Sequence, residues 1–509
     1  MPAPRRWVLA ATILGSAMTF IDGTVVNVAL PALQTDLHAT ITDVQWVIEA
    51  YALFVGALIL VGGSMGDQFG RKRVFLFGVV FFTLASMLCG MATSPGMLIA
   101  GRALQGIGAA FLVPGSLAII SASFDEKERG AAIGTWSGFS SITTAIGPVS
   151  GGWLVEHVSW RAVFFLNVPI AILVIALSLR FMNESRDPSR TSQIDWTGAM
   201  LAVVGLGGIV FGLLEWPPLG ALHPLVLGTL VIGVASLAAL LRVEGRTPNA
   251  MLPLALFRSQ PFTLANVLTL LLYAALGITM LLVPLNLIQV QHYSPTAAGA
   301  SLLPFPIIMF VLSRWSGALV ARVGSRLPLT VGPVIAAIGF ALYARPGTDG
   351  SGIDGSYWTT FFPAIVVLGF GMAVTVAPLT TTVMGAVDPR HAGAASGINN
   401  AVARVAGLMA IAIFGVMLAR TFEIRVTPRL DRLSLSPAAR SDVDRELPKM
   451  AGADIERVSA GPEDRAAVRA AIDEGFVFAF RMVMICAAGL ALAAAACGRR
   501  LRSHATRAR

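Results

Sequence analysis

The chain has 509 residues, of which 55% are hydrophobic and 13% are charged, and its formal net charge is +9. Soluble domains carry about 25% charged residues. A long chain with half that share cannot cover a water-facing surface, so the composition excludes a soluble enzyme and predicts a polytopic membrane protein. Three cysteines, Cys89, Cys486 and Cys497, lie inside apolar runs, which argues against a disulfide-stapled secreted protein. The basic residues lie in short loops between apolar runs, so membrane topology explains the charge without a nucleic-acid partner.

Apolar runs long enough to cross a bilayer, about 20 residues each, recur along the whole chain. In chain order they fall at 7–30, 44–66, 74–92, 97–120, 130–153, 161–182, 196–215, 223–242, 262–288, 298–320, 327–345, 358–382, 394–419 and 475–497. The sequence therefore predicts an all-α protein with 14 spans. The first run follows two arginines, as a signal peptide would, but it is too long for one and contains Asp22, so we assign it as a span.

The basic residues are distributed unequally between alternate loops. If the N-terminus is cytoplasmic, the short outer loops contain only Arg161 and Arg345, whereas most other loop arginines and lysines lie on the inner side, including the C-terminal tail. This positive-inside pattern predicts that both termini are cytoplasmic. The expected location is the cytoplasmic membrane of a bacterium.

One predicted outer loop, 421–474, is much longer than the others and is rich in Arg, Asp, Ala and Pro. This composition predicts a solvated cap that a short linker could replace, and the stretch 462–474 predicts a helix that begins at Pro462. The alternative is a docking surface for a partner in the cell envelope.

Short sequence matches relate the first six spans to the last six. GIGAA at 106–110 matches GFGMA at 369–373, and GAAIG at 130–134 matches GAASG at 393–397. Parallel six-helix repeats place a substrate path at their interface. We therefore predict three parts: an N-terminal six-helix bundle over 1–182, a linker with two extra helices over 183–258, and a C-terminal six-helix bundle with the long loop and basic tail over 259–509.

Five motifs resemble those of the major facilitator superfamily and, within it, the fourteen-span drug:proton antiporters of the EmrB/QacA type. They are IDGTVVNVALP at 21–31, GSMGDQFGRKR at 63–73, RALQGIG at 102–108, GPVSGG at 147–152 and WRAVFFLNVP at 160–169. The resemblance implies the major facilitator fold and proton-coupled efflux of drugs. The second repeat departs from the first, because Ala321 stands where the first repeat has Asp67.

The resemblance also implies roles for two sets of residues. The first is a cytoplasmic gating motif, which comprises Gly63, Asp67, Gly70, Arg71, Lys72 and Arg73. The second is an antiporter-type motif in the fifth span, which comprises Gly138, Gly147, Pro148, Gly151 and Gly152. A basic cluster that stops translocation is the alternative for the first set, and close helix packing is the alternative for the second.

Charged residues inside spans are costly and indicate functional sites. Asp22 and Glu49 are the acids well inside the spans, and Arg102 is a base at a similar depth. We expect them to share one layer, where Asp22 carries protons, Glu49 lies nearer the surface and selects substrates, and Arg102 modulates the acid. The alternative is a static ion pair between Asp22 and Arg102 that joins two helices.

The six histidines lie in loops or the tail, and none of the three lysines follows a glycine, so we expect no metal site, no phosphate-binding loop and no cofactor. Polar residues of spans 1, 4, 9 and 12 are candidates for the substrate path, namely Thr24, Asn27, Gln105, Asn266, Tyr273, Thr375 and Thr380.

These features predict a monomeric secondary transporter, not an enzyme, that exports amphipathic compounds, cationic ones included, in exchange for protons. Acids in an apolar cavity would attract lipophilic cations. Two alternatives are the export or flipping of an endogenous lipid, siderophore or antibiotic, and a membrane scaffold or sensor that does not transport.

Overall fold

The computed structural model describes residues 3–124, 126–185, 195–246, 254–348, 356–387 and 392–501. Within α2, α5, α13 and α16 some side chains lie outside this description, among them those of Asp67, Gly138 and Arg314. Below, the inner end of the molecule is the end predicted to face the cytoplasm, and the outer end is the opposite one.

The first group of helices comprises α1 (Ala3–Leu37), α2 (Ile41–Phe69), α3 (Arg71–Gly90), α4 (Pro95–Ser123), α5 (Glu126–His157), α6 (Ala162–Phe165) and α7 (Asn167–Phe181). The inserted segment comprises α8 (Trp196–Leu214), α9 (Trp216–Leu219), α10 (Pro224–Glu244) and the 3-10 turn η1 (Leu254–Arg258). The C-terminal group comprises α11 (Gln260–Leu285), the π-helical turn η2 (Asn286–Val290), α12 (Pro295–Ser301), α13 (Pro304–Val323), α14 (Arg326–Tyr343), α15 (Phe361–Gly385), α16 (Ala392–Leu430) and α18 (Pro462–Arg500).

Among the described residues, 13 helical segments are long and apolar enough to cross a membrane. The predicted span at 130–153 falls in α5, which forms a continuous helix but contains residues outside the description. Two predicted spans contain an interruption in the helix but remain single candidate spans. These are Ala162–Phe181, with a turn at Leu166 between α6 and α7, and Pro295–Leu312, where α12 ends before α13 begins at Pro304. A run of apolar residues does not reveal such breaks, because the hydropathy continues across them.

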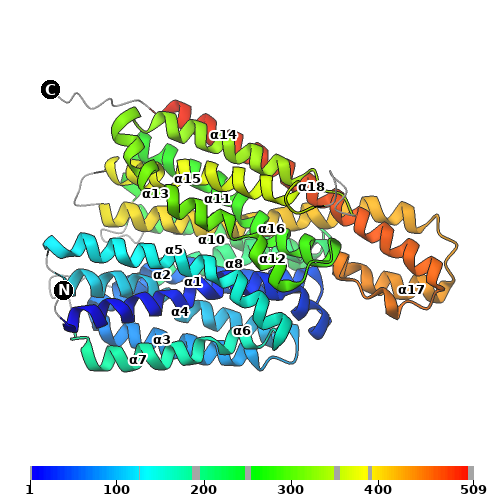
Figure 1. Cartoon of the computed structure of the whole chain (residues 1–509), viewed down its shortest axis with the longest axis horizontal. Coiled ribbons are helices and arrows are strands. Elements are labelled where there is room, and N and C mark those ends of the chain that lie inside the picture. The colour runs from blue at the N-terminus through cyan, green and yellow to red at the C-terminus, as the bar shows by residue number, and fades with distance from the viewer. Residues whose placement is uncertain are drawn as a thin grey trace.

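The two groups of helices repeat the same packing. In the first group α1 contacts α5 and α7, α2 contacts α4, and α3 contacts α4 and α7; in the second, α11 contacts α16 and α18, α13 contacts α15, and α14 contacts α15 and α18. In Figure 1 the first group fills the lower half of the bundle and the second group fills the upper half. This is the arrangement expected of two copies of a six-helix unit.

One inserted helix, α8, packs against the interface between the two groups of helices. At this interface α2 of the first group meets α16 of the second, and it is called the seam below. α8 contacts both α2 and α16, and an apolar cluster joins Val210 and Leu214 of α8 to Leu53 of α2 and Leu408 of α16. The Trp46 indole N–H donates a hydrogen bond of 3.2 Å to Glu215, just beyond α8. The insertion therefore covers one side of the α2–α16 seam.

The predicted outer loop is a folded subdomain with a small core of its own, where the sequence predicted a solvated cap. α16 and α18 have 39 residues each, or about 58 Å, and extend well beyond a hydrocarbon core of about 30 Å. Between them lie α17 (Pro437–Glu446) and the 3-10 turns η4 (Leu447–Gly452) and η5 (Ile455–Arg457), as the right side of Figure 1 shows. Apolar side chains such as Val443 and Val458 are fully buried there. The predicted helix start at Pro462 is confirmed, but that helix continues without a break into the last span.

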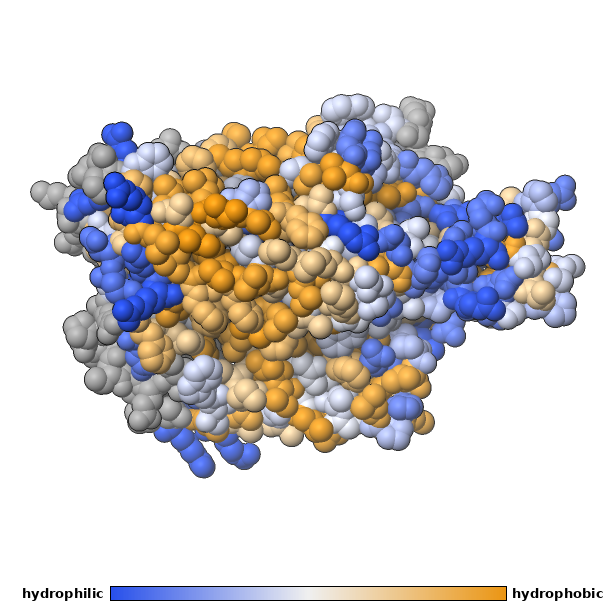
Figure 2. Space-filling model, turned by 90° about the horizontal axis from the view of Figure 1, so that it is seen from below, coloured by the Kyte–Doolittle hydropathy of each residue, from blue (hydrophilic) through white to orange (hydrophobic). Residues whose placement is uncertain are grey.

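On the face shown in Figure 2, a wide apolar band covers the middle of the bundle and is flanked by polar residues at both ends. α1 begins and α18 ends at the same end of the bundle, opposite the outer subdomain (Figure 1). The described chain therefore enters and leaves the bundle at one face.

Candidate coupling site

A buried ion pair joins α1 to α4. The carboxylate of Asp22 accepts hydrogen bonds from Arg102 Nη1 at 2.5 Å and from Gln105 Nε2 at 2.7 Å. The guanidinium of Arg102 also donates to the Val47 carbonyl at 3.0 Å and lies 4.2 Å from the ring centroid of Tyr51. Both charged side chains are almost fully enclosed, with 2% and 0% exposed. The hydrogen bonds and the opposite charges compensate for the lost hydration, so this pair also ties both helices to α2.

Glu49 lies on α2 but is not part of this cluster. Its residue is 0% exposed, and both carboxyl oxygens are enclosed without a hydrogen-bond partner. On a helix with 3.6 residues per turn, Glu49 points roughly opposite to Val47 and Tyr51. Glu49 therefore lies at the same depth as the pair, since Val47 and Tyr51 both contact Arg102, but on the opposite face of α2. The structure corrects the expectation that Glu49 lies near water, because the residue is fully enclosed in this conformation.

The face of α2 that carries Glu49 forms the seam with α16. Toward the outer end, a Cβ atom on Gly415 of α16 would lie 2.4 Å from Gln45 Nε2. One turn further in than Glu49, Leu53 packs against Leu408. Glu49 is therefore enclosed between two points of close contact in the interface of the two helical groups.

A second seam at the outer end joins α5 to α12. A Cβ atom on Gly152 would lie 2.4 Å from the Pro295 carbonyl oxygen, and one on Gly299 would lie 2.1 Å from the Pro148 carbonyl oxygen. The backbone N–H of Thr296 donates to the Glu156 carboxylate at 3.2 Å. Since α2 with α16 and α5 with α12 both meet closely near the outer end, this conformation is closed on the outer side.

The fifth-span glycines also pack against α1. A Cβ atom on Gly147 would meet Thr24 Oγ1 at 2.0 Å, and one on Gly151 would meet a methyl group of Val25 at 2.3 Å. Gly138 lies outside the described side chains. These contacts within the first group are the close packing that was the alternative interpretation of this motif, and Gly152 alone among the described glycines of the motif packs against α12 across the second seam.

The gating motif lies at the inner end, between α2 and α3. Gly70 has a φ of +110°, a conformation that favours glycine. The Glu184 carboxylate accepts hydrogen bonds from the backbone N–H groups of Lys72 at 3.1 Å and Arg73 at 3.2 Å, and the Lys72 ammonium donates to the Met182 carbonyl at 2.7 Å. The motif is thereby attached to the segment after α7. Gly63 packs near Pro114, while the side chain of Asp67 lies outside the description.

The candidate path residues have different surroundings. Asn266 is buried and its side-chain oxygen accepts from Asn399 at 3.1 Å, within the C-terminal group. Thr375 is fully buried, donates to the Gly371 carbonyl and packs against α14, so its hydroxyl does not face a cavity here. Thr380 is exposed, and three candidates are half-buried: Thr24, Asn27 and Tyr273.

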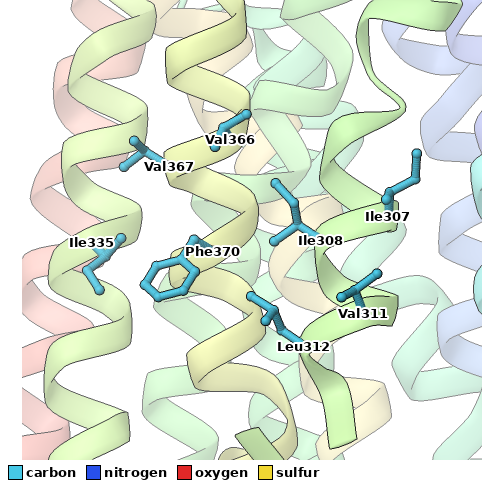
Figure 3. A pocket seen from close by; sticks show the side chains of 8 residues that line it. All are labelled: Ile307, Ile308, Val311, Leu312, Ile335, Val366, Val367 and Phe370. Carbon is cyan, nitrogen blue, oxygen red and sulfur yellow. The ribbon is translucent and has the colours of Figure 1, made fainter. Parts of the chain in front are cut away.

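An apolar pocket of about 520 Å³ lies elsewhere, between α13, α14 and α15. Figure 3 shows its lining, which includes Ile308, Leu312, Ile335 and Phe370. The neighbouring Val311 is 65% exposed on the outside of the bundle. The pocket therefore opens toward the lipid and is separate from the ion pair and from Glu49.

Sequence reasoning missed two features of this region. Glu184 follows a span end and has no motif of its own, so the cap that it forms on α3 was not predicted. The inserted helices were assigned as spans, but nothing in their apolar sequence indicated that α8 covers the seam. Among the described residues, no group of three or more His, Cys, Asp or Glu side chains could hold a metal ion.

Comparison with known proteins agrees with this geometry. The family model of the Major Facilitator Superfamily matches residues 12–411. The multidrug resistance protein Stp of Mycobacterium tuberculosis is 34% identical over 85% of this chain and 79% of its own length. The puromycin resistance protein pur8 of Streptomyces alboniger is 36% identical, with 82% of each chain covered. The tetracenomycin C resistance and export protein of Streptomyces glaucescens is 33% identical over 82% of this chain and 76% of its own length.

Solved structures share the fold at low sequence identity. A bacterial homologue of the human lysosomal transporter Spinster, in an inward-facing conformation, matches with a TM-score of 0.64 and 18% identity over 98% of both chains. An auto-inhibited peptide transporter of the POT family matches with a TM-score of 0.66 and 13% identity, again over 98% of both chains. The repeated packing, the motif residues and these matches together show that the chain belongs to the Major Facilitator Superfamily.

Proposed function

We propose that this protein exports amphipathic small molecules in exchange for protons across the cytoplasmic membrane of a bacterium, with both termini in the cytoplasm. The names of three relatives, which describe multidrug resistance, puromycin resistance and tetracenomycin C export, support the substrate class. The observation that carries the proposal is the enclosed and unpartnered carboxyl of Glu49 in the seam between the two helical groups. We keep residues 1–182, 183–258 and 259–509 as the three functional parts.

The position of Glu49 couples closure of the outer end to protonation of this residue. A carboxylate enclosed without a donor or a cation is several kcal/mol less stable than the neutral acid, so the seam closes around Glu49 only when this group carries its proton. When the outer end opens, α2 separates from α16 and water reaches the carboxyl. The transporter then returns to the outer-closed conformation only after Glu49 has taken up a proton from outside. Antiport is complete when a compound binds from the inner side and this proton leaves toward the cytoplasm, so that the seam reopens around a charged carboxylate.

Asp22 has a different role in this scheme. Its charge is already balanced by Arg102 and Gln105 in the outer-closed conformation. We propose that this ion pair positions α1, α2 and α4 relative to one another, and that Glu49 carries the transported proton. This scheme exchanges the roles that sequence reasoning gave to the two acids.

The test is a proton-flux assay with the purified protein in liposomes that contain a pH-sensitive dye. Candidate compounds, beginning with puromycin and tetracenomycin C, are added under an imposed pH gradient. We expect compound-dependent proton movement in liposomes with the protein and none in empty liposomes. Transport of a compound without any proton movement would contradict the coupling, and no transport of any compound would contradict the export function.

A further inference from the structure

Arg404 is a second intramembrane arginine on the seam, and its surroundings differ from those of Arg102. It lies about a third of the way along α16 (Ala392–Leu430), about 18 Å from the inner start of the helix. Its Cβ atom is 3.8 Å from the position that a Cβ atom on Gly56 of α2 would occupy. Arg404 therefore lies where the two helical groups cross, near the middle of the membrane.

The charge of Arg404 has no counterpart in the part of the chain that the structure describes. No carboxylate or carbonyl there accepts a hydrogen bond from its guanidinium, and its nitrogen atoms are not among the enclosed polar atoms without a partner. By contrast, Arg102 is paired with Asp22, and Arg481 donates to the Pro346 carbonyl at 2.9 Å. The residue as a whole is half-buried, so part of Arg404 remains accessible.

Arg404 lies on the inner side of the closed seam. One turn of α16 toward the outer end, Leu408 packs into the apolar cluster with Leu53 and α8. One turn toward the inner end, Asn400 is exposed. Arg404 is thus the first polar group next to the closed part of the seam, where the two groups begin to separate.

We infer that Arg404 binds the anionic group of the transported compound, so that the substrates include amphipathic acids with a carboxylate, sulfonate or phenolate. An uncompensated cation inside a membrane is costly, and an anionic ligand removes this cost. The planar guanidinium binds such oxyanions through two parallel hydrogen bonds. Among the intramembrane charges that the structure describes, Arg102 neutralises Asp22, the closed seam requires a neutral Glu49, and Arg404 is left as a cation without a carboxylate or carbonyl partner. This inference rests on the proposed function and reverses the expectation of cationic substrates.

The experiment measures binding and transport of three related fluorescent compounds. Dansyl-leucine carries a carboxylate, its amide is neutral, and dansylcadaverine carries an ammonium group. Binding to the purified protein is measured by dansyl fluorescence, and transport is measured in everted membrane vesicles. We expect the native protein to bind dansyl-leucine at least tenfold more tightly than its amide and to show no preference for dansylcadaverine.

The variant Arg404→Gln should lose the preference for the acid and keep its affinity for the amide, while Arg404→Lys should retain part of the preference. Arg481→Gln is the matched control, because it removes a span arginine that already binds carbonyl groups. An equal loss for the acid and the amide, a native preference for the ammonium compound, or no effect of Arg404→Gln would overturn the inference. Binding without uphill transport of any compound would contradict the proposed export function and leave the assignment of Arg404 supported.

A different set of contacts places the outer subdomain across both helical groups. Gln34 near the outer end of α1 is fully buried, and its amide N–H donates to the Lys449 carbonyl in η4 at 3.0 Å. Its side-chain oxygen accepts from Gln289 of η2 at 2.7 Å. Arg469 of α18 donates to the Gln289 carbonyl at 2.6 Å, and a Cβ atom on Gly452 would lie 2.6 Å from the Gln34 oxygen. The subdomain therefore holds α1 of the first group against the C-terminal group.

We propose that this subdomain is a strap over the outer end that must leave Gln34 before the protein opens outward. A buried amide that loses its partners pays a desolvation penalty of about 1–3 kcal/mol unless water replaces them, so the contact favours the outer-closed conformation. This role replaces the expectation that a short linker could substitute for the segment.

The test is a disulfide across this contact, in a background with Cys89, Cys486 and Cys497 replaced by alanine. The pair Gln34→Cys with Gly452→Cys should cross-link on oxidation, stop export in everted vesicles, and regain export after reduction. The pair Val426→Cys with Gly475→Cys joins α16 to α18 within the C-terminal group, where a Cβ atom on Gly475 would lie 2.1 Å from a methyl group of Val426; this pair is the control and should remain active when oxidised. Failure of the first pair to cross-link, or export at the native rate by the cross-linked protein, would overturn the proposal.

Discussion

Asp22 and Arg102 form an ion pair of 2.5 Å that is enclosed in the membrane part of the protein, and Gln105 binds the second carboxylate oxygen. The pair connects α1 with α4, and the Val47 carbonyl extends it to α2. Both oxygens of the Asp22 carboxylate have a hydrogen-bond donor. We therefore expect the removal of one partner to lower the stability of the protein more than it changes proton coupling.

Replacement of Asp22 by asparagine should destabilise the protein by about 3–5 kcal/mol, because it leaves the Arg102 cation buried without its anion. The double variant Asp22→Asn/Arg102→Gln should recover much of this loss, since neither charge remains. Thermal unfolding in detergent measures both effects. If the double variant unfolds at the native temperature and still couples export to protons, Asp22 has a positioning role. Loss of coupling in a stable double variant would show that Asp22, and not Glu49, carries the transported proton.

Replacement of Glu49 by glutamine should uncouple transport from protons. The amide keeps the shape of the neutral acid, so the outer seam closes without the uptake of a proton. We expect export down a concentration gradient to continue while an imposed pH gradient no longer accelerates it. The measurement compares uptake in everted vesicles with and without the gradient, and Glu423→Gln, at an exposed pair with Arg420, is the control. A pH effect of native size in Glu49→Gln would show that the proton binds elsewhere.

Removal of the Glu184 carboxylate should loosen the gating motif. Glu184→Ala leaves the Lys72 and Arg73 backbone N–H groups without their acceptor, and loss of such a cap costs about 1 kcal/mol. We expect a lower unfolding temperature and faster proteolysis of the segment between α2 and α3 at the inner face. Glu184→Asp should restore part of the stability. Unchanged proteolysis in Glu184→Ala would argue that the motif is held by other contacts.

Valine in place of Gly152 should prevent the outer seam from closing. The added side chain would overlap the Pro295 backbone, which has no flexible end that could move aside. We expect little export and faster labelling of an engineered Gln34→Cys by a membrane-impermeant maleimide. Gly489→Val is the control, since no atom lies within 4 Å of a Cβ atom at that position. Slow labelling together with normal export in Gly152→Val would contradict the closed seam.

The fold was largely predictable from the sequence, because it depends on regular, local patterns. Apolar runs near 20 residues, basic residues on alternate sides and short repeated motifs are all readable along one chain. The inner gating motif and the fifth-span glycines were likewise recognisable as motifs. The folded outer subdomain was not, since its polar surface hides a small core, including Val443 and Val458, that forms only when α16 and α18 extend outward together.

The environment of each intramembrane charge was decided by the tertiary structure. The sequence by itself places Asp22, Glu49, Arg102 and Arg404 within apolar runs and gives each an approximate depth. It does not determine which face of a helix meets which neighbour, so it could not distinguish the paired Asp22 from the enclosed and unpartnered Glu49. The physical reason is that the energy of a buried charge depends on donors and counter-charges within a few ångströms. Those neighbours come from helices up to hundreds of residues away, across a seam that exists only in the folded protein.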